Sequence, residues 1–162
     1  MAADLENTLY LEVPAGRVVI EMRPDLAPKH CAQIKELVRK GFYDGIVFHR
    51  VIEGFMVQTG CPHGTGTGGS GKHLKAEFSK EKHLRGVCSM ARAQDPNSAD
   101  SQFFIMLDNT PSLDGQYSIW GKVTSGMEYI DAIKKGSPSR NGSVTDPDKI
   151  ISFKVAADVA AA

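Results

Sequence analysis

Residues 42–60 of the chain read FYDGIVFHRVIEGFMVQTG. Within this stretch, residues 46–51 and 55–58 form two short apolar runs separated by three residues, and such runs are typical of β-strands. Successive side chains of a strand point to opposite faces, so Phe48 and Arg50 are expected on the same face of the first run. We therefore predict two strands here, with one arginine among apolar side chains.

The sequence before this stretch predicts a hairpin followed by a helix. Residues 8–13 and 17–22 both alternate apolar and polar side chains, and the turn Pro14-Ala15-Gly16 between them indicates a β-hairpin. The period then changes. Apolar residues at spacings of three and four predict a helix that begins near Pro28, a residue suited to a first helical turn. Gly41 can end this helix because glycine readily adopts the left-handed conformation.

The sequence after the stretch predicts four more strands and a second helix. Ser125 is predicted to begin the helix, with Glu128 three residues later completing a capping box. Lys134 and Lys135 would lie in the last turn, where cations complement the helix dipole, and Gly136 would stop the helix. The four predicted strands are residues 87–91, 102–107, 118–123 and 150–155.

Eight strands and two helices predict a mainly β protein. We expect a closed eight-stranded antiparallel barrel capped by two α-helices, because closure removes the exposed edges at which strands pair with other chains. A chain of 162 residues corresponds to about one domain, so residues 1–162 are predicted to form a single domain with its body over about residues 7–156. The small residues of the C-terminal tail, 156–162, are predicted to be frayed.

Charge and composition exclude several classes of function. Nineteen basic and nineteen acidic residues give no net charge, which argues against non-specific nucleic-acid binding and against a polybasic membrane anchor. No apolar run approaches the roughly 18 residues of a membrane span, and the first residues do not resemble a secretory signal. Three cysteines without a C-x-x-C pair argue against a disulfide framework or a zinc site. We therefore expect a cytoplasmic protein that binds neither nucleic acid nor membrane.

Two local patterns have competing interpretations. Residues 64–69, GTGTGG, fit a dinucleotide-binding loop, and residues 66–72 fit the start of a phosphate loop. No apolar strand precedes them, and His73 stands where a phosphate loop needs Ser or Thr, so a surface loop bordering another site is preferred. Asn141-Gly142-Ser143 fits a glycosylation sequon and is interpreted as a turn. The five histidines lack metal-ligand spacing, so neither a metal nor another cofactor is expected.

Residues 42–60 strongly resemble the characteristic sequence of the cyclophilins, which are peptidyl-prolyl cis-trans isomerases. The resemblance extends from about Leu9 to Val155 and implies an eight-stranded barrel with two helices. It also implies an isomerase that rotates X-Pro bonds without covalent chemistry, assists protein folding and binds proline-containing segments of client proteins. Nothing in the sequence suggests more than a monomer. Four further blocks carry the resemblance in the family's order: residues 89–93, 101–105, 113–115 and 120–123.

The resemblance assigns roles to individual residues. Arg50 matches the catalytic arginine, Phe55 a wall of the catalytic proline pocket, and Gln58 a polar residue that orients Arg50. The remaining matches bind substrate. Met56, Phe104 and Leu113 match the rest of the proline pocket, and Gln102 matches a second polar residue. Gly66 and Thr67 match the rim of a neighbouring subsite, and Arg92 and Ala93 match a segment whose backbone pairs with the residues before proline.

Three positions depart from the best-known pattern of the family. Arg92 stands where Asn is usual, which changes little if this residue acts through its backbone. Tyr117, also assigned to substrate binding, stands where His is usual and keeps one hydrogen-bonding group. Ser112 stands where cyclosporin-sensitive members carry Trp, so cyclosporin is expected to bind weakly.

Two alternatives stay open beside an active isomerase. The first is a module that holds proline-containing segments without catalysis, and such a module would tolerate the loss of Arg50. The joint presence of Arg50, Phe55 and Gln58 favours the enzyme. The second is a nucleotide-binding protein, which would be stabilised against heat by nucleotide. Without the resemblance, the apolar site residues would be interpreted as core.

Overall fold

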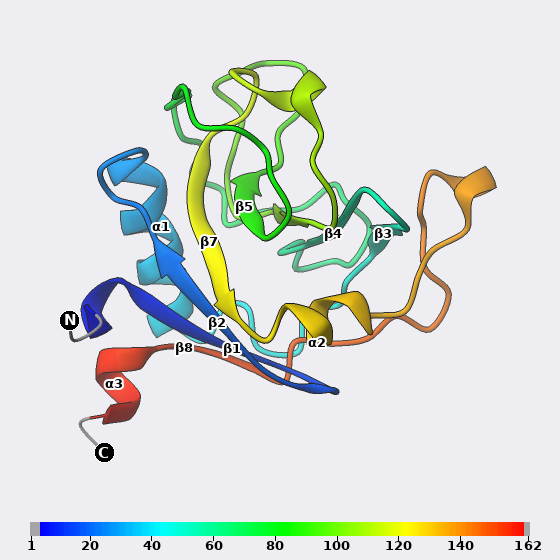
Figure 1. Ribbon diagram of the computed structural model, residues 1–162, viewed down its shortest axis with the longest axis horizontal. Helices are drawn as coiled ribbons and strands as arrows, with labels where there is room; N and C mark the ends of the chain where they lie inside the picture. The colour runs from blue at the N-terminus through cyan, green and yellow to red at the C-terminus, as the bar shows by residue number, and fades with distance from the viewer. Residues whose placement is uncertain (1–3, 161–162) are drawn as a thin grey trace.

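The computed structural model of the chain describes residues 4–160. Eight strands form one sheet in which every pair of neighbours is antiparallel, so the predicted mainly β architecture is confirmed (Figure 1). The neighbour order is β3-β4-β6-β5-β7-β2-β1-β8. The strands are β1 Thr8–Val13, β2 Gly16–Met22, β3 Arg50–Ile52, β4 Met56–Thr59, β5 Val87–Met90, β6 Phe103–Met106, β7 Ile119–Ser125 and β8 Ser152–Val155.

The prediction of a closed barrel is wrong in one respect, because β3 and β8 share no ladder. The segments just before these strands meet instead. Val47 pairs with Lys149 in an isolated bridge, and the N–H of Phe48 donates to the carbonyl of Asp148 at 2.9 Å. Irregular backbone therefore satisfies these polar groups, and the strand predicted over residues 46–51 is shortened to β3.

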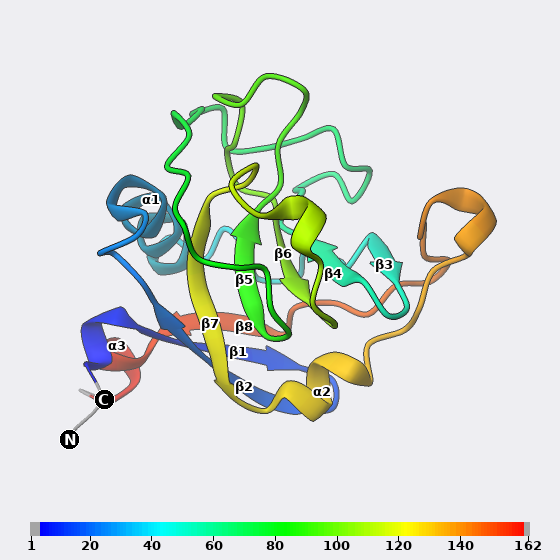
Figure 2. The same cartoon turned by 45° about the horizontal axis from the view of Figure 1, so that its top comes forward.

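The free edge of β3 is covered by the loop of residues 136–144, which projects beside β3 in Figure 2. The N–H of Val51 donates to the carbonyl of Gly142, and the N–H of Gly136 donates to the carbonyl of Val51, each at 2.8 Å. A Cβ atom on Gly136 would lie 1.8 Å from the carbonyl oxygen of Gly142, so only glycine allows this approach. Gly136 thus serves packing against β3 rather than the predicted helix stop.

Helix α1 spans Pro28–Arg39 as predicted, and packs against β7 and β8. Gly41 follows it with a φ of 73°, which confirms the left-handed ending. The N–H groups of Gly41 and Phe42 donate to the carbonyls of Val38 and Leu37 at 3.1 and 3.0 Å. These two bonds form a Schellman motif, so the glycine fixes where the helix ends.

The second helix begins and ends elsewhere than predicted. Helix α2 spans Met127–Asp131 and packs against β2. Ser125 is the last residue of β7 and caps nothing. The N-cap is Gly126, whose φ is 85°, and a Cβ there would lie 2.5 Å from the carbonyl oxygen of Arg17. The capping-box prediction is therefore wrong, and Lys134 and Lys135 lie beyond the helix.

The frayed-tail prediction is wrong up to residue 160. Residues Ala156–Ala160 form helix α3, which packs against β1 and against the 3-10 helix η1, Leu5–Asn7. Ala156 is buried, and Asp158 pairs with Arg39 at 3.1 Å. The rest of the predicted tail, residues 161 and 162, lies outside the described residues. Two further 3-10 helices are η2 Pro111–Leu113 and η3 Pro138–Arg140.

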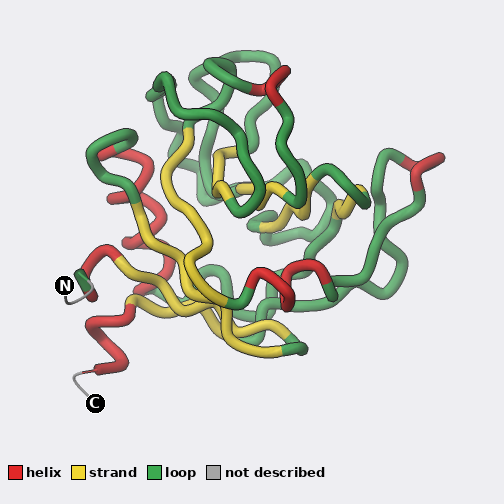
Figure 3. Tube along the Cα trace, in the orientation of Figure 1, coloured by secondary structure: helices red, strands yellow, loops and turns green. Residues whose placement is uncertain are grey.

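Strands β4 and β6 carry apolar side chains on both faces. Val57, Phe103 and Ile105 point into the main core, to which helices α1 and α2 also contribute buried side chains. Alternate residues point to the opposite face of the sheet, because successive side chains of a strand alternate. There Met56, Phe104 and Met106 pack with Val87 and Ile119 into a second buried cluster. In the upper part of Figure 3, most of the chain forms loops.

Candidate active site

Two cavities adjoin each other, and the first of them lies over the second apolar cluster. The first has a volume of about 170 Å³ and is called the proline cavity, after the residues that the resemblance assigns to a proline pocket; the second has a volume of about 270 Å³. Gln58 and Arg92 border both. All twelve residues assigned from the sequence line one cavity or the other. Of these, the proline cavity is lined by Arg50, Phe55, Met56, Gln58, Arg92, Phe104, Leu113 and Tyr117, and the second by Gln58, Gly66, Thr67, Arg92, Ala93 and Gln102. Residues that were not assigned line them too: Ala91 both cavities, and Gly68, Gly69, His73, Ser98 and Asp100 the second.

Arg50 is held at the wall of the proline cavity by neutral groups. Its Nη1 donates to Oε1 of Gln58 at 3.1 Å, and its Nε and Nη2 donate to the carbonyl oxygen and Oδ1 of Asn141, each at 3.0 Å. Burial lowers the pKa of the guanidinium, which nevertheless keeps its charge at neutral pH. Among residues 4–160 no carboxylate pairs with it, so the charge is left uncompensated beside a cavity whose walls include the apolar side chains of Phe55, Met56, Phe104 and Leu113.

Amide side chains continue from Arg50 to the glycine-rich loop. Nε2 of Gln58 donates to Oε1 of Gln102 at 3.0 Å, and Nε2 of Gln102 donates to the carbonyls of Gly66 and Gly68, each at 2.9 Å. Each amide thus uses its oxygen toward Arg50 and its nitrogen toward the loop. The row fixes both amide orientations and connects the proline cavity with the second cavity.

The glycine-rich loop borders the site as expected and is not followed by a helix. It is anchored from beneath by Cys61, whose sulfur accepts the N–H groups of Gly66 and Gly68 at 3.3 and 3.2 Å. Burial raises the pKa of this thiol, but the backbone donors outweigh it and lower the pKa to about 6. A dinucleotide loop needs a helix after it, so the geometry disfavours that alternative.

Asn141 is a residue of the site that the sequence did not reveal. It follows η3 with a φ of 56°, which confirms that the sequon lies in a turn. Its carbonyl and its side-chain oxygen are two of the three acceptors of Arg50. The two residues are 91 positions apart, and no local pattern indicates such a contact.

His83 is a second missed residue, and it supports the wall of the proline cavity. Its Nε2 lies 3.0 Å from Oγ of Ser89, and its Nδ1 lies 3.2 Å from Oδ1 of Asp114. This arrangement has the order of a nucleophilic triad, but His83 and Ser89 are buried and therefore closed to a substrate. The imidazole stacks under Phe104 with ring centroids 6.1 Å apart, so the set positions an apolar wall.

The backbone assigned to substrate pairing is only partly free. The N–H of Ala93 donates to Oγ of Ser98 at 2.9 Å, so it is already used within the protein. The N–H of Ala91 pairs with the carbonyl of Gln102 at 3.0 Å. Arg92 lies between them, and its backbone N–H and carbonyl have no partner among residues 4–160. The available backbone is therefore that of Arg92.

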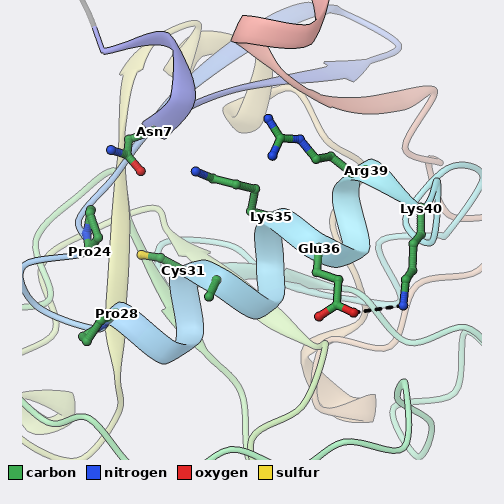
Figure 4. A pocket seen from close by; sticks show the side chains of 9 residues that line it. Asn7, Pro24, Pro28, Cys31, Lys35, Glu36, Arg39 and Lys40 are labelled. Carbon is green, nitrogen blue, oxygen red and sulfur yellow. Dashed lines mark hydrogen bonds and ion pairs between the residues drawn. The ribbon is translucent and has the colours of Figure 1, made fainter.

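A cavity of about 580 Å³ lies elsewhere, beside α1 (Figure 4). None of the predicted site residues lines it. Its cations are paired: Lys35 with Glu6 at 3.4 Å, Arg39 with Glu6 at 3.0 Å, and Lys40 with Glu36 at 3.0 Å. Among the described residues, no group of three or more His, Cys, Asp or Glu is arranged to hold a metal ion. The predicted site residues lie instead at the two adjoining cavities.

The sequence of the chain is similar to those of known proteins. The family model described as "Cyclophilin type peptidyl-prolyl cis-trans isomerase/CLD" matches residues 8–155. A "Probable peptidyl-prolyl cis-trans isomerase" of Brucella suis biovar 1 (strain 1330) is 57% identical over 169 residues, covering 97% of this chain and 86% of that protein. "Peptidyl-prolyl cis-trans isomerase B" of Bacillus subtilis (strain 168) is 43% identical over 134 residues, covering 82% of this chain and 93% of that protein.

Solved structures are similar as well. The cyclophilin AquaCyp293 from Hirschia baltica superposes with a TM-score of 0.87 at 29% identity, covering 98% of this chain and 77% of that chain. A cyclophilin type isomerase of Cryptosporidium parvum, crystallised in the presence of the dipeptide Ala-Pro, superposes with a TM-score of 0.82 at 30% identity, covering 91% of this chain and 98% of that chain. The chain therefore belongs to the family of cyclophilin-type peptidyl-prolyl cis-trans isomerases.

Proposed function

We propose that the two cavities bind proline-containing segments of client proteins, with the proline ring in the proline cavity and Arg50 as the catalytic residue. The observation that carries this proposal is the uncompensated guanidinium of Arg50 in the wall of a cavity that also carries four large apolar side chains, Phe55, Met56, Phe104 and Leu113. A charged donor at such a wall can face the one polar atom of a bound proline ring, its nitrogen.

The mechanism acts on the partial double bond of the peptide link. Rotation about that bond has a barrier of about 18–20 kcal/mol, because the nitrogen lone pair is conjugated with the carbonyl. During rotation the lone pair becomes localised on nitrogen, where an N–H of Arg50 can donate to it. The planar ground state offers this donor less electron density, so the interaction favours the transition state. No covalent bond forms and no proton is transferred.

The other assigned residues hold the substrate. Phe55, Met56, Phe104 and Leu113 are proposed to grip the proline ring, with Tyr117 at the rim. Their apolar surface also excludes water from the rotating carbonyl, which strengthens the hydrogen bond from Arg50. Gln58 and Gln102 are proposed to hold the guanidinium of Arg50 and the loop of Gly66 and Thr67 in fixed positions relative to each other. The residues before proline would pair with the backbone at Arg92 and border Ala93.

The size of the effect can be set against this division of roles. A rate acceleration of about 10⁴ needs about 5.5 kcal/mol. One hydrogen bond to a charged group contributes about 1.5–3 kcal/mol. The apolar cavity therefore has to supply the rest, and loss of Arg50 should be severe without being complete.

The test replaces Arg50 and measures isomerisation of a short X-Pro peptide. Arg50→Ala should lower kcat/KM by at least about a hundredfold, or about 2.7 kcal/mol, and leave thermal unfolding cooperative. Arg39→Ala is a matched control, since Arg39 lies on α1 and is paired with Glu6 and Asp158. Retention of more than half the activity in Arg50→Ala would refute the mechanism. A wild type that binds the peptide without accelerating rotation would support the binding-module alternative.

We further propose that residues 1–162 act as one monomeric domain in the cytoplasm, assisting protein folding, and that cyclosporin binds weakly because of Ser112. The three cysteines are unpaired and buried, which fits a reducing compartment. No helix among the described residues is long and apolar enough to cross a membrane. Size-exclusion chromatography coupled to light scattering tests the monomer directly.

A further inference from the structure

The side chain of Arg92 makes a set of hydrogen bonds within the rim of the site. Its Nε and Nη2 donate to the carbonyl of Gln116 at 3.0 and 2.8 Å. Its Nη1 donates to the carbonyls of Ala93 and Gln94 at 2.9 and 3.2 Å. The guanidinium thus joins two segments that are more than twenty residues apart in the chain.

Aromatic rings hold the same guanidinium from its faces. Its central carbon lies 4.8 Å from the ring centroid of Tyr117 and 6.0 Å from that of Phe78. Tyr117 in turn meets Phe104 edge-on, with centroids 5.5 Å apart. Arg92 therefore supports one wall of the proline cavity as well as the ridge between the two cavities.

These contacts bear on the backbone of Arg92 itself. Its N–H and carbonyl are unpaired within residues 4–160, whereas the N–H groups of Ala91 and Ala93 on either side are bonded to Gln102 and Ser98. An unpaired N–H and carbonyl in an ordered segment offer an edge to which an extended peptide can add. The side chain of Arg92 keeps that segment in place by binding the two carbonyls that follow it.

We propose that Arg92 is a positioning residue: its guanidinium clamps residues 92–94 to Gln116, and so presents its own backbone N–H and carbonyl to the residues that precede proline. This inference rests on the proposed function of the two cavities. It also changes the meaning of the Arg in place of the usual Asn, because the side chain has a role of its own.

The geometry requires arginine rather than any cation. Arg92 reaches three carbonyls in two segments with a planar fork, while a lysine ammonium is a single point on a flexible stem. A lysine would keep the charge at the rim but could not bridge both segments in one plane. Arg92→Lys therefore separates the clamp from the charge, and Arg92→Met removes both while preserving much of the apolar stem.

The experiment compares two peptide substrates of different length, one with a single residue before proline and one with three. For Arg92→Met and Arg92→Lys we expect KM of the longer peptide to rise about tenfold and that of the shorter peptide to rise clearly less, because only the longer peptide extends along the backbone of Arg92. Arg39→Met is the matched control, because Arg39 also makes four side-chain hydrogen bonds, all to Glu6 of η1 and Asp158 of α3. It should change neither peptide.

Amide hydrogen exchange supplies a readout independent of turnover. The clamp predicts faster exchange over residues 92–94 in both Arg92 variants, with exchange of β4 and β6 unchanged. Equal losses for the two peptides, or full function in Arg92→Lys, would overturn the clamp. If wild type accelerates neither peptide, or Arg50→Ala changes nothing, the proposed function itself fails, which is a distinguishable result.

Discussion

Arg50 and Gln58 face each other across the β3–β4 pair, and Nη1 of Arg50 donates to Oε1 of Gln58 at 3.1 Å. The strand register therefore determines the direction of the guanidinium. Because Gln58 also donates to Gln102, which donates to the glycine-rich loop, the same register connects both cavities. Arg50 and the loop that borders the second cavity are parts of one hydrogen-bonded row.

Gln58→Leu should break this row while preserving the volume of the side chain. We expect kcat/KM to fall about tenfold, since Arg50 loses one hydrogen bond that orients its charge, which is worth about 1.4 kcal/mol. The measurement is a double-mutant cycle with Arg50→Ala. In the Arg50→Ala background Gln58→Leu should cost much less, because the group that it orients is gone. Full additivity of the two losses would show that Gln58 acts independently of Arg50.

Asn141 offers a cleaner test of how Arg50 is held. Asn141→Gly removes the Oδ1 acceptor of Nη2 but keeps the carbonyl acceptor of Nε, and glycine adopts the local φ of 56° readily. We expect kcat/KM to fall several-fold with no loss of thermal stability. Asn141→Ala should show the same kinetic loss and, in addition, about 1–2 kcal/mol of backbone strain. Unchanged activity in both variants would remove Asn141 from the site.

The activity of wild type should depend little on pH between 7 and 9. The proline cavity is lined by no His, Cys, Asp or Glu of the described chain, and Arg50 does not lose its charge in this range. His49, next to Arg50, stays neutral there because burial and the neighbouring guanidinium lower its pKa. Measuring kcat/KM in buffers of constant ionic strength tests this. A bell-shaped profile would reveal a titrating group in the reaction.

The free energy of unfolding should fall as the pH drops below the pKa of an unperturbed histidine, about 6.5. Burial lowers the pKa of His30 and of His83, although the carboxylates of Glu77 and Asp114 oppose the shift. Histidines of the unfolded chain titrate near pH ~6.5, so below that pH the unfolded chain binds more protons than the native one. The free energy of unfolding then rises with pH in this window and is lost as the pH falls through it.

Urea unfolding at about pH 7, 6 and 5 measures this slope, because these values span the range in which histidine titrates. Cys61 contributes in the same direction, mainly above pH 6, because its pKa of about 6 lies below the ordinary thiol value of about 8.5. Cys61→Ser should therefore leave the slope between pH 6 and 5 nearly intact, while His83→Gln should reduce it. A free energy of unfolding that is constant or larger at pH 5 would contradict the buried, neutral histidines.

Local pattern and long-range contact explain what the sequence could predict. The hairpin of β1 and β2 and helix α1 follow from alternation, from spacing and from Gly41, all of which act within a few residues. The second helix was misplaced because Ser125 fits a cap locally, whereas pairing of β7 with β2 extends the strand through it. Tertiary pairing outweighed a local preference there.

The site divides in the same way. All twelve residues that the resemblance assigned line the two cavities, but the chain gave no local indication of Asn141 beside Arg50 or of Asp114 beside His83, which join segments far apart in sequence. The open junction of β3 and β8 also depends on a loop, residues 136–144, whose packing against β3 no alternation pattern encodes. These features come from the assembled fold.

Ser112 is expected to weaken the binding of cyclosporin. It lies exposed in η2, directly before Leu113 of the proline cavity. In cyclosporin-sensitive members of the family a Trp stands here, and an indole offers a broad apolar face and one N–H donor. A serine hydroxyl covers far less area. Losing one neutral hydrogen bond costs about 0.5–1.5 kcal/mol, and losing much of an aromatic contact costs about as much again.

Together these losses predict inhibition at least about tenfold weaker than in relatives with Trp, at about 1.4 kcal/mol per decade. Ser112→Trp should recover most of the affinity. Peptide isomerisation should change little, because Ser112 itself lines neither cavity. Titration of both proteins with the drug, followed by inhibition of the isomerase assay, gives the two affinities side by side. If wild type binds cyclosporin as tightly as Ser112→Trp, then this position does not control sensitivity, and the cavity walls that both proteins share must determine it.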